Sequence, residues 1–315
     1  MKNQILLTGC NGFLGHYLSQ FLAEKGYSVL AHTRKVQTFN HSNIANINFD
    51  LNDSLNNIDL GKVGIIIHCA GRAHVMNETA ASPLEAYRQT NVQGTLNLAQ
   101  KAVESGVKRF IYLSSIKVNG EQTTTQAFKP NDCVQTDDPY GLSKYEAEQA
   151  LLELSKNTGL EVVIIRPVLI YGPNVKANFK SMVNLASKKF PLPIGCLDNK
   201  RSMVSVYNLA DLIHTCMTHP NANREVFLAS DQDDISVKQL FEKLAKCQNN
   251  KLLMLPVPKS LINFLASLVG KKAVASRLCS ELVVDTTKNT QLLGWTAPYS
   301  VDASLEKMFN TPHKN

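Results

Sequence analysis

Residues 4–15 read QILLTGCNGFLG. A short apolar run ends in threonine, and three glycines follow at the spacing GxxGxxG, at Gly9, Gly12 and Gly15. From residue 14 to residue 22 the apolar side chains recur with the period of a helix. A strand, a glycine turn and a helix in this order let backbone N–H groups approach a pyrophosphate at the positive end of the helix. The stretch therefore predicts a dinucleotide-binding turn at the start of an α/β fold.

Short apolar runs alternate with helical patterns along the first half of the chain. Several runs are apolar without a break, such as VGIIIHCA at 63–70, which is typical of strands buried on both faces. Long helices are expected from Ser82 to Ser105 and from Pro139 to Asn157. The alternation predicts an α/β protein with a doubly wound parallel sheet. The predicted strands are residues 4–8, 28–32, 46–49, 64–69, 109–114 and 161–166.

The regular alternation weakens after Arg166, where prolines and glycines become frequent. We expect residues 1–166 to form a nucleotide-binding domain. Residues 167–315 are expected to form mainly a smaller C-terminal α/β lobe for the substrate, and the chain would return to the first domain near residues 203–229. An amphipathic helix from Leu261 to Val269 is expected to pack onto the core rather than to lie on a membrane.

Composition excludes several classes of protein. The chain has 315 residues, of which 44% are apolar and 19% charged, so it is not a largely disordered chain. The net charge is +7, but the basic residues occur as singles and pairs, so no nucleic-acid binding is expected. No run of about 18 apolar residues occurs, so no membrane insertion is expected. Seven cysteines without a CxxC pair favour reduced thiols in a cytoplasmic protein. HTCMTH at 214–219 lacks a carboxylate, and we predict no metal site.

Two motifs carry acid–base chemistry. In PYGLSK, Tyr140 and Lys144 stand at i and i+4, on one face of the predicted helix. An ammonium group near a phenol lowers the phenol pKa, so the tyrosine can transfer protons near neutral pH. Ser114 and Ser115 follow the strand RFIYL, at the sheet edge where open α/β proteins bind ligands. We expect a serine hydroxyl there to hydrogen-bond a substrate oxygen beside the tyrosine.

Taken together, these motifs resemble the extended short-chain dehydrogenase/reductase superfamily, in its NAD-dependent epimerase/dehydratase branch, which acts on nucleotide sugars. The resemblance implies a Rossmann fold, a nicotinamide cofactor, a UDP-sugar substrate and a homodimer. It covers most of the chain and rests on motifs in the same order: TGCNGFLG at 8–15, HCAG at 68–71, TNVQGT at 90–95, SSIKVNG at 114–120, YGLSK at 140–144, RPVLIYGP at 166–173, RSMVSVYNLAD at 201–211 and LLGWTAPYSVDASL at 292–305.

The same resemblance implies roles for individual residues. Tyr140 would be the catalytic acid/base, Lys144 would hydrogen-bond the nicotinamide ribose, and Ser115 would hold the reacting oxygen. Asn178 and Arg201 would contact the substrate. Ser114 and His74 are expected to contact it because each follows the end of a predicted strand, although an ordinary loop histidine is the alternative for His74. Further cofactor contacts are implied for Gly9, Gly12, Phe13, Leu14, Gly15, Asp50, Leu51, Cys69, Ala70, Gly71, Asn91 and Pro167, with Asn91 also bracing the helix that carries the tyrosine.

The end of the second strand bears on the choice of cofactor. NAD-binding folds usually carry an acidic residue there, which takes the adenosine ribose hydroxyls. Residues 29–35 read VLAHTRK and contain no acid. Arg34 and Lys35 would suit a 2′-phosphate, although two solvated basic residues on a loop are the alternative. The cofactor is therefore predicted as NAD(P), with NADP slightly favoured.

Departures from the family pattern narrow the reaction. Ile116 and Lys117 stand where dehydratases carry Asp and Glu, so 4,6-dehydration is not expected. Asn119 replaces a frequent tyrosine, and with a resemblance to enzymes of bacterial polysaccharide synthesis it favours a 4-keto-reductase or dehydrogenase of a UDP-2-acetamido-2,6-dideoxyhexose. A UDP-sugar 4-epimerase, of UDP-glucose or UDP-N-acetylglucosamine type, is the alternative. A non-catalytic NADP-binding regulator would be expected to lose Tyr140 or Lys144, and both are present.

Overall fold

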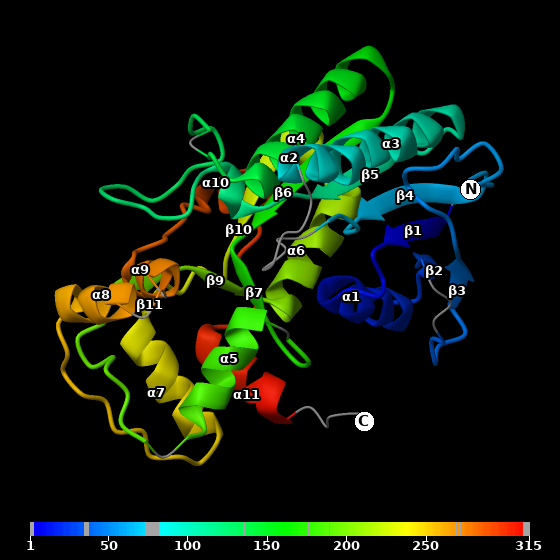
Figure 1. The fold of residues 1–315 in the computed structure, drawn as a ribbon. Coiled ribbons are helices and arrows are strands. Elements are labelled where there is room, and N and C mark those ends of the chain that lie inside the picture. The colour runs from blue at the N-terminus through cyan, green and yellow to red at the C-terminus, as the bar shows by residue number, and fades with distance from the viewer. Residues whose placement is uncertain are drawn as a thin grey trace.

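The computed structural model describes residues 3–34, 38–72, 82–134, 136–175, 177–188, 190–268, 270 and 272–310. Its centre is a parallel sheet of seven strands in the order β10-β6-β5-β4-β1-β2-β3 (Figure 1). Residues 63–68 and 161–167 are buried along nearly their whole length, as the unbroken apolar runs predict. The sheet consists of β1 (Gln4–Thr8), β2 (Ser28–His32), β3 (Ile44–Ile47), β4 (Val63–His68), β5 (Arg109–Leu113), β6 (Glu161–Pro167) and β10 (Glu225–Ala229).

Helices cover both faces of the sheet, which confirms the predicted doubly wound α/β fold (Figure 1). On one face Leu18 and Ile213 pack into the core from α1 (Phe13–Glu24) and α6 (Val206–Thr218). On the other, Leu98 and Leu151 pack from α3 (Gly94–Glu104) and α4 (Pro139–Asn157). The helix expected over 82–105 is interrupted: α2 (Pro83–Tyr87) and α3 are joined by the π-helix η1 (Arg88–Gln93).

A third buried cluster lies outside the sheet and forms the core of the C-terminal lobe, where Phe179, Leu240 and Leu305 meet. Two small sheets, β7 with β9 and β11 with β8, stand beside it. The elements of this half of the chain are β7 (Leu169–Tyr171), α5 (Ala177–Ala186), β8 (Lys200–Arg201), β9 (Met203–Ser205), η3 (Pro220–Ala222), β11 (Ile235–Ser236), α7 (Val237–Cys247), α8 (Lys259–Leu268), α9 (Lys272–Cys279), α10 (Thr287–Leu293) and α11 (Val301–Asn310).

The chain passes between the sheet and the C-terminal lobe repeatedly. It leaves the sheet after β6, returns in α6 and β10, and leaves again for β11 and α7. Leu293 and Trp295 then pack against the core of the sheet, whereas Val301 packs in the lobe. Residues from both halves of the chain therefore build the core that packs beneath α1 and α6.

The helix predicted over 261–269 differs from expectation in its surroundings. It forms as α8, but none of its described residues is buried. The prediction that its apolar face packs onto the core is therefore wrong. Among the described helices, none is both long and apolar enough to span a lipid bilayer.

Candidate active site

The glycine turn after β1 packs tightly against the end of β4. Gly9 has a φ of 77°, and a Cβ atom at this residue would lie 2.8 Å from the amide nitrogen of Ala70. A Cβ atom at Gly15 would lie 2.7 Å from the carbonyl carbon of Gly9. Only glycine fits both places. The amide of Gly12 donates to the carbonyl of Gly9, 2.9 Å away, and α1 starts at the next residue. The turn thus points the first amides of α1 at the space above the sheet, as a pyrophosphate requires.

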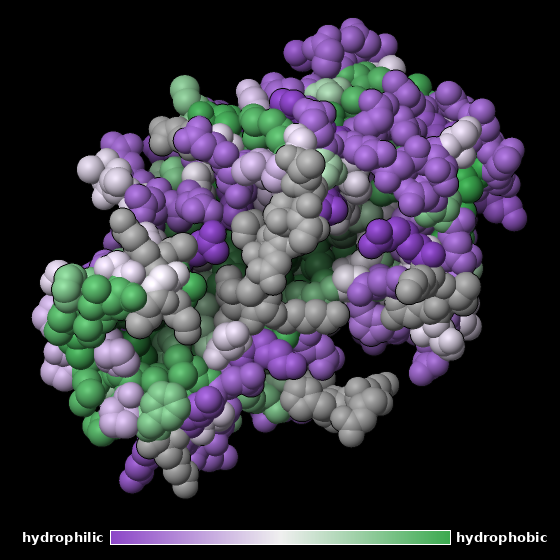
Figure 2. Space-filling model, viewed as in Figure 1, coloured by the Kyte–Doolittle hydropathy of each residue, from purple (hydrophilic) through white to green (hydrophobic). Residues whose placement is uncertain are grey.

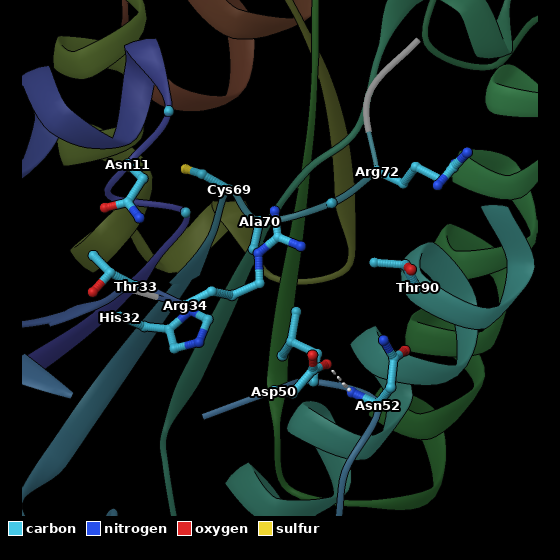
Figure 3. A pocket seen from close by; sticks show the side chains of 14 residues that line it. Asn11, His32, Thr33, Arg34, Asp50, Asn52, Cys69, Ala70, Arg72 and Thr90 are labelled. Atoms are coloured by element: carbon cyan, nitrogen blue, oxygen red, sulfur yellow. Dashed lines mark hydrogen bonds between the residues drawn. The ribbon is translucent and has the colours of Figure 1, made fainter. Parts of the chain in front are cut away.

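That space is a cavity of about 590 Å³ at the carboxyl ends of the first strands (Figure 3). Its size is within the range of cofactor pockets, about 300–1,000 Å³. Sequence reasoning identified eight of its lining residues, namely Gly9, Gly12, Arg34, Asp50, Leu51, Cys69, Ala70 and Gly71. It missed Asn11, His32, Thr33, Asn52, Arg72 and Thr90, which a parallel sheet brings together only once its strand order is known.

Arg34 and Asp50 line this cavity from two different strand ends. Figure 3 shows the Arg34 side chain extending from the end of β2 into the pocket, with Asp50 entering it from the loop after β3. One carboxylate oxygen of Asp50 accepts the backbone amide of Asn52 at 2.9 Å. Arg34 can pair with a phosphate, and Asp50 can accept from ribose hydroxyls. The acid that residues 29–35 lack is thus present in the pocket, on a neighbouring loop.

Tyr140 and Ser115 meet where α4 begins. Asp138 caps α4 by accepting the amide of Gly141 at 2.9 Å, which sets Tyr140 in the first turn. Ser115 caps the short helix η2 (Ile116–Val118), and the interaction of its hydroxyl with the Tyr140 phenol lowers the pKa of the phenol. A Cβ atom at Gly141 would lie 2.7 Å from the carbonyl oxygen of Lys117. Glycine at this position therefore lets α4 approach η2 closely, which brings Tyr140 towards Ser115.

Burial controls the protonation of the tyrosine. It raises the pKa of Tyr140 to about 12, and the hydrogen bond from Ser115 opposes this rise. The sequence-based expectation was that Lys144 lowers this pKa, and in the chain alone burial outweighs any such lowering. The phenol therefore holds its proton at neutral pH, ready to donate it to an oxygen.

Lys144 lies one turn further along α4, under the end of β4. Its ammonium nitrogen donates to the carbonyl of Leu113 at 2.9 Å and lies 6.0 Å from the centre of the Tyr140 ring. Burial lowers the pKa of Lys144 to about 8, although charge interactions with Cys69 and Glu148 oppose the change. The structure thus brings Ser115, Tyr140 and Lys144 together beside the cavity.

Asn91 connects this cluster to the edge of the cavity. Its side-chain oxygen accepts the amide of Arg72 at 2.8 Å, and its side-chain nitrogen donates to the carbonyl of the same residue at 3.0 Å. The nitrogen also donates to the hydroxyl of Ser143, which donates in turn to the carbonyl of Tyr140 at 2.8 Å. Because Asn91 lies in the π-helix η1, the turn that interrupts the predicted helix also aims this amide at α4.

His68, at the end of β4, extends the same network towards the glycine turn. Thr95 donates its hydroxyl hydrogen to the carbonyl of Asn91 at 2.7 Å, so His68 Nε2 donates to Thr95 over 3.0 Å. Nδ1 then accepts from Thr8 at 2.7 Å. Burial holds the pKa of His68 well below its usual range. Sequence reasoning assigned this histidine no role, and its position at the strand end was the available signal.

The other predicted cofactor residues do not line the cavity. Phe13 packs towards the third cluster, and Leu14 packs against the core beneath α1. Gly15 shapes the turn from below, and Pro167 ends β6 beside Ala229. These positions surround the cavity at a distance, and contacts of Phe13, Leu14 and Pro167 with a cofactor remain predictions.

The predicted substrate residues are more dispersed. Ser114 is buried, and within the described residues its hydroxyl has no hydrogen-bond partner, so a ligand oxygen would satisfy it. Arg201, in β8, donates to the carbonyls of Arg277 and Ser280 at 2.7 and 3.1 Å. His74 lies outside the described residues, and so does the side chain of Asn178. Their roles stay predictions.

Asn119 has a structural environment that the sequence did not reveal. Its side chain is only 1% exposed, accepts from Arg166 at 2.9 Å and donates to the carbonyl of Lys129 at 2.8 Å. Arg166 also forms a buried ion pair with Glu148, 2.6 Å away. Asn119 therefore holds the segment after η2 against β6, and its polar atoms are occupied within the protein.

The positions that carry the acidic pair in dehydratases are also occupied differently. Ile116 is buried, and the ammonium of Lys117 lies 3.2 Å from a carboxylate oxygen of Asp138. As for the predicted absence of a metal site, the described residues contain no group of three or more His, Cys, Asp and Glu side chains suited to an ion. In HTCMTH, His214 hydrogen-bonds the hydroxyl of Tyr27 at 3.1 Å.

A doubly wound sheet, a glycine turn at its first strand and a Ser–Tyr–Lys cluster beside the cavity define a dinucleotide-binding oxidoreductase fold of the extended short-chain dehydrogenase/reductase class. The model of the NAD dependent epimerase/dehydratase family matches residues 5–229. The chain belongs to this family. It is 43% identical to a UDP-glucose 4-epimerase of Vibrio cholerae over 311 residues, 98% of this chain and 94% of the relative.

Two further matches extend the comparison. An N-acetyl-α-D-glucosaminyl-diphospho-ditrans,octacis-undecaprenol 4-epimerase of Escherichia coli O157:H7 is 28% identical over 98% of this chain and 94% of its own length. The crystal structure of a UDP-glucuronic acid 4-epimerase of Bacillus cereus in complex with NAD superposes with a TM-score of 0.75, over 97% of this chain and 95% of that chain. At 20% identity, this structural match shows the shared fold.

Proposed function

We propose that the protein is a UDP-sugar 4-epimerase that uses NAD(P) to oxidise and reduce C4 of a hexose. The observation that carries the proposal is the grouping of Tyr140, Ser115 and Lys144 beside the cavity lined by the glycine turn, where the ammonium of Lys144 lies 6.0 Å from the centre of the Tyr140 ring. The 43% identity to a UDP-glucose 4-epimerase over nearly the whole chain supports the same assignment.

The residues of the cavity fit a dinucleotide. The glycine turn leaves no room for side chains where a pyrophosphate would lie, and Arg34 and Asp50 supply a cation and an acceptor at the adenosine end. Lys144 lies at the other end, near Gly71, where a Cβ atom would lie 3.4 Å from its ammonium. The nicotinamide, when bound, supplies the chemistry of accepting and returning a hydride.

The protein's own residues handle the proton. When C4 is oxidised, Tyr140 must be in its ionised form, and its oxygen takes the proton of the C4 hydroxyl. When C4 is reduced, the protonated phenol gives that proton back. The Ser115 hydroxyl donates to the same sugar oxygen and so stabilises charge that develops there. The ammonium of Lys144 favours the ionised phenol because it is a nearby positive charge. The unpaired hydroxyl of Ser114 is available to a second ligand oxygen.

One structural observation favours the 4-epimerase reaction over the 4-keto-reductase reaction. The sequence preference for a 6-deoxy sugar pocket rested on Asn119 and on a resemblance to enzymes of polysaccharide synthesis, and the Asn119 side chain is engaged by Arg166 and Lys129 instead. A 4-keto-reductase uses the same Ser–Tyr–Lys cluster and is the second candidate. The supply of cofactor distinguishes the two reactions, because an epimerase regenerates its cofactor in each cycle whereas a reductase consumes one reduced cofactor for each product.

The test incubates the purified protein with UDP-glucose, UDP-N-acetylglucosamine or N-acetylglucosaminyl-diphospho-undecaprenol and separates the C4 epimers by chromatography. Catalytic amounts of NAD(P) should suffice, and Tyr140→Phe should abolish turnover. A parallel assay supplies a UDP-4-keto-6-deoxy-N-acetylhexosamine with NAD(P)H. Stoichiometric loss of reduced nicotinamide in that assay, with no epimer formed in the first, would replace the epimerase by the reductase.

A further inference from the structure

The exposed apolar side chains of the protein are concentrated in one segment. Nine large apolar residues are exposed in the described part of the chain, and seven of them lie between residues 253 and 274. Phe264 is 59% exposed and Leu268 is 68% exposed. We call this set the apolar edge: Leu253, Leu255, Leu261, Phe264, Leu265, Leu268 and Val274. Figure 2 shows hydrophobic atoms gathered where Figure 1 places α8 and α9, at the left of the molecule.

The residues of the apolar edge are regularly spaced along the chain. Leu261, Phe264, Leu265 and Leu268 follow the spacing i, i+3, i+4, i+7, so they form one continuous stripe on α8. Ile262, on another side of the helix, packs against the core of the lobe. In the extended segment before α8, Leu253 and Leu255 face solvent, whereas Leu252 and Met254 pack inward. The segment thus has one face fixed to the lobe and one apolar face turned outwards.

The charge of the chain is concentrated in the same place. Residues 243–280 contain seven Lys and Arg residues and no Asp or Glu, whereas the rest of the chain contains 26 basic and 26 acidic residues. The whole net charge of +7 is therefore carried by this segment. Lys243 pairs with Asp302, and Arg277 lies 3.7 Å from Glu121. Lys251 and Lys259 have no ion pair within the described residues.

We propose that the apolar edge binds the surface of an anionic lipid bilayer, with α8 and α9 lying along the interface. An apolar stripe flanked by lysines, without acidic residues, is the pattern of helices that insert at the level of the headgroups. A second copy of this chain is a poorer occupant, because pairing two such faces would bring two positively charged segments together. The two helices also pack on each other at the periphery of the molecule, where a flat surface can reach them (Figure 1).

The apolar edge is connected to β8, which carries the predicted substrate residue Arg201. Asn199, just before this strand, donates to the carbonyls of Leu278 and Ser280 at 3.0 and 2.8 Å. Arg201 donates to the carbonyls of Arg277 and Ser280. These bonds hold the last turn of α9, so a bilayer bound by the edge would lie at a fixed position relative to β8.

The experiment measures co-sedimentation of the full-length protein, without substrate, with vesicles of phosphatidylcholine alone and with vesicles that also contain phosphatidylglycerol. We expect binding to the anionic vesicles, weakened by added salt because the attraction is partly electrostatic. Lys251→Gln with Lys259→Gln should weaken binding roughly fivefold for each side chain removed. Phe264→Glu with Leu268→Glu should abolish it. Both positions of this second pair are exposed, so folding should be preserved, and thermal unfolding checks this.

Matched controls keep the outcome specific. Lys62→Gln with Lys156→Gln removes two exposed lysines elsewhere, and Lys62→Gln alone removes one of them. These proteins should bind vesicles as the wild type does. All variants should keep wild-type turnover on a UDP-sugar in the absence of lipid, which separates this proposal from the proposed function.

Two results would overturn the proposal. The first is absence of wild-type binding to anionic vesicles, or equal binding by Phe264→Glu with Leu268→Glu. The second is a wild-type oligomer, measured by light scattering, that the same double variant dissociates while vesicles bind neither protein. That result would assign the apolar edge to a second copy of the chain.

Discussion

The side-chain amide of Asn91 donates to the hydroxyl of Ser143 across 3.0 Å, and this bond joins the π-helix η1 to the helix that carries Tyr140 and Lys144. Both groups are buried, and each makes a further bond, Asn91 to Arg72 and Ser143 to the carbonyl of Tyr140. The position of Tyr140 is therefore coupled to the backbone at the edge of the cavity.

Asn91→Ala should impair both stability and turnover. It removes three hydrogen bonds and leaves buried partners unsatisfied, so the free energy of unfolding should fall by about 1–3 kcal/mol or more. A displacement of Tyr140 by about 1 Å would cost on the order of 100-fold in turnover. Urea unfolding and initial rates measure the two effects. The control is Asn157→Ala, an exposed residue of α4 that should change neither. Unchanged turnover in Asn91→Ala would disprove the coupling.

Tyr140→Phe should leave the fold and dinucleotide affinity nearly unchanged, because it removes one oxygen atom and keeps the ring. Turnover should fall by at least about 100-fold, the low end for loss of a positioned acid/base. The comparison requires rates and dinucleotide titration on the same preparation. Activity within a few-fold of wild type would rule out the assigned roles of Ser115, Tyr140 and Lys144.

Gly141→Ala tests the close approach of α4 to η2. The added methyl group would lie 2.7 Å from the carbonyl oxygen of Lys117, closer than unstrained atoms come, so α4 must move away from Ser115. Turnover should fall by about tenfold or more, because the Tyr140 phenol should move away from Ser115. Gly159→Ala, where no atom lies within 4 Å, should be neutral. Equal rates for the two variants would contradict the proposed fit.

Arg34→Ala separates the two cofactors. If the guanidinium pairs with a 2′-phosphate, NADP binding should weaken by about 1–3 kcal/mol, the scale of a charge-assisted hydrogen bond, with NAD affinity almost unchanged. Asp50→Ala should act in the opposite sense and weaken NAD more, because it removes the acceptor for ribose hydroxyls. Fluorescence titration with both dinucleotides measures this. An equal change for both cofactors in Arg34→Ala would reject the role of the arginine.

Lys144 should give the protein a characteristic pH dependence of stability without cofactor. Burial lowers its pKa from 10.5 to about 8, so the unfolded chain binds more protons between these values and this residue makes stability rise with pH. Lys144→Met should remove that contribution. The free energy of unfolding of this variant should exceed that of the wild type most at neutral pH, and the excess should shrink from about pH 8 upwards. Urea unfolding is followed below pH 10, because above it the raised pKa of Tyr140 makes stability fall.

The exposed Lys156→Met provides the reference for this pH series. Its free energy of unfolding is compared with that of the wild type over the same range. If the two lysine variants behave alike, the ammonium of Lys144 is hydrated in the folded protein, and burial does not set its pKa.

The sequence predicted the sheet well because short unbroken apolar runs, such as residues 63–70 and 161–166, are best explained as buried strands. It also predicted Tyr140 and Lys144 as neighbours, since a helix brings i and i+4 together. The π-helix at Arg88–Gln93 was not predictable, because its residues have no periodicity that differs from an ordinary helix. The prediction of one continuous α-helix over residues 82–105 was therefore wrong for its middle part.

Long-range partners explain the remaining differences. Asn119 meets Arg166, which pairs with Glu148, only after three elements have packed, so its sequence position alone did not reveal these bonds. The apolar stripe of α8 was recognised, but an amphipathic pattern does not specify what covers the apolar face. Asp50 enters the cavity from a loop. Local sequence patterns do not show that this residue and Arg34 line the same cavity.

The repeated passage of the chain between sheet and lobe limits how the enzyme can exchange its ligands. Two domains joined by a single polypeptide connection can swing apart about a hinge. Here several connections would have to bend together, namely those after β6, before α6, after β10 and around Trp295. We therefore expect the frame to stay closed while a dinucleotide enters or leaves through local rearrangement of the segments at its rim. Slow release of a cofactor from such a frame is what an enzyme that returns its hydride in every cycle can tolerate.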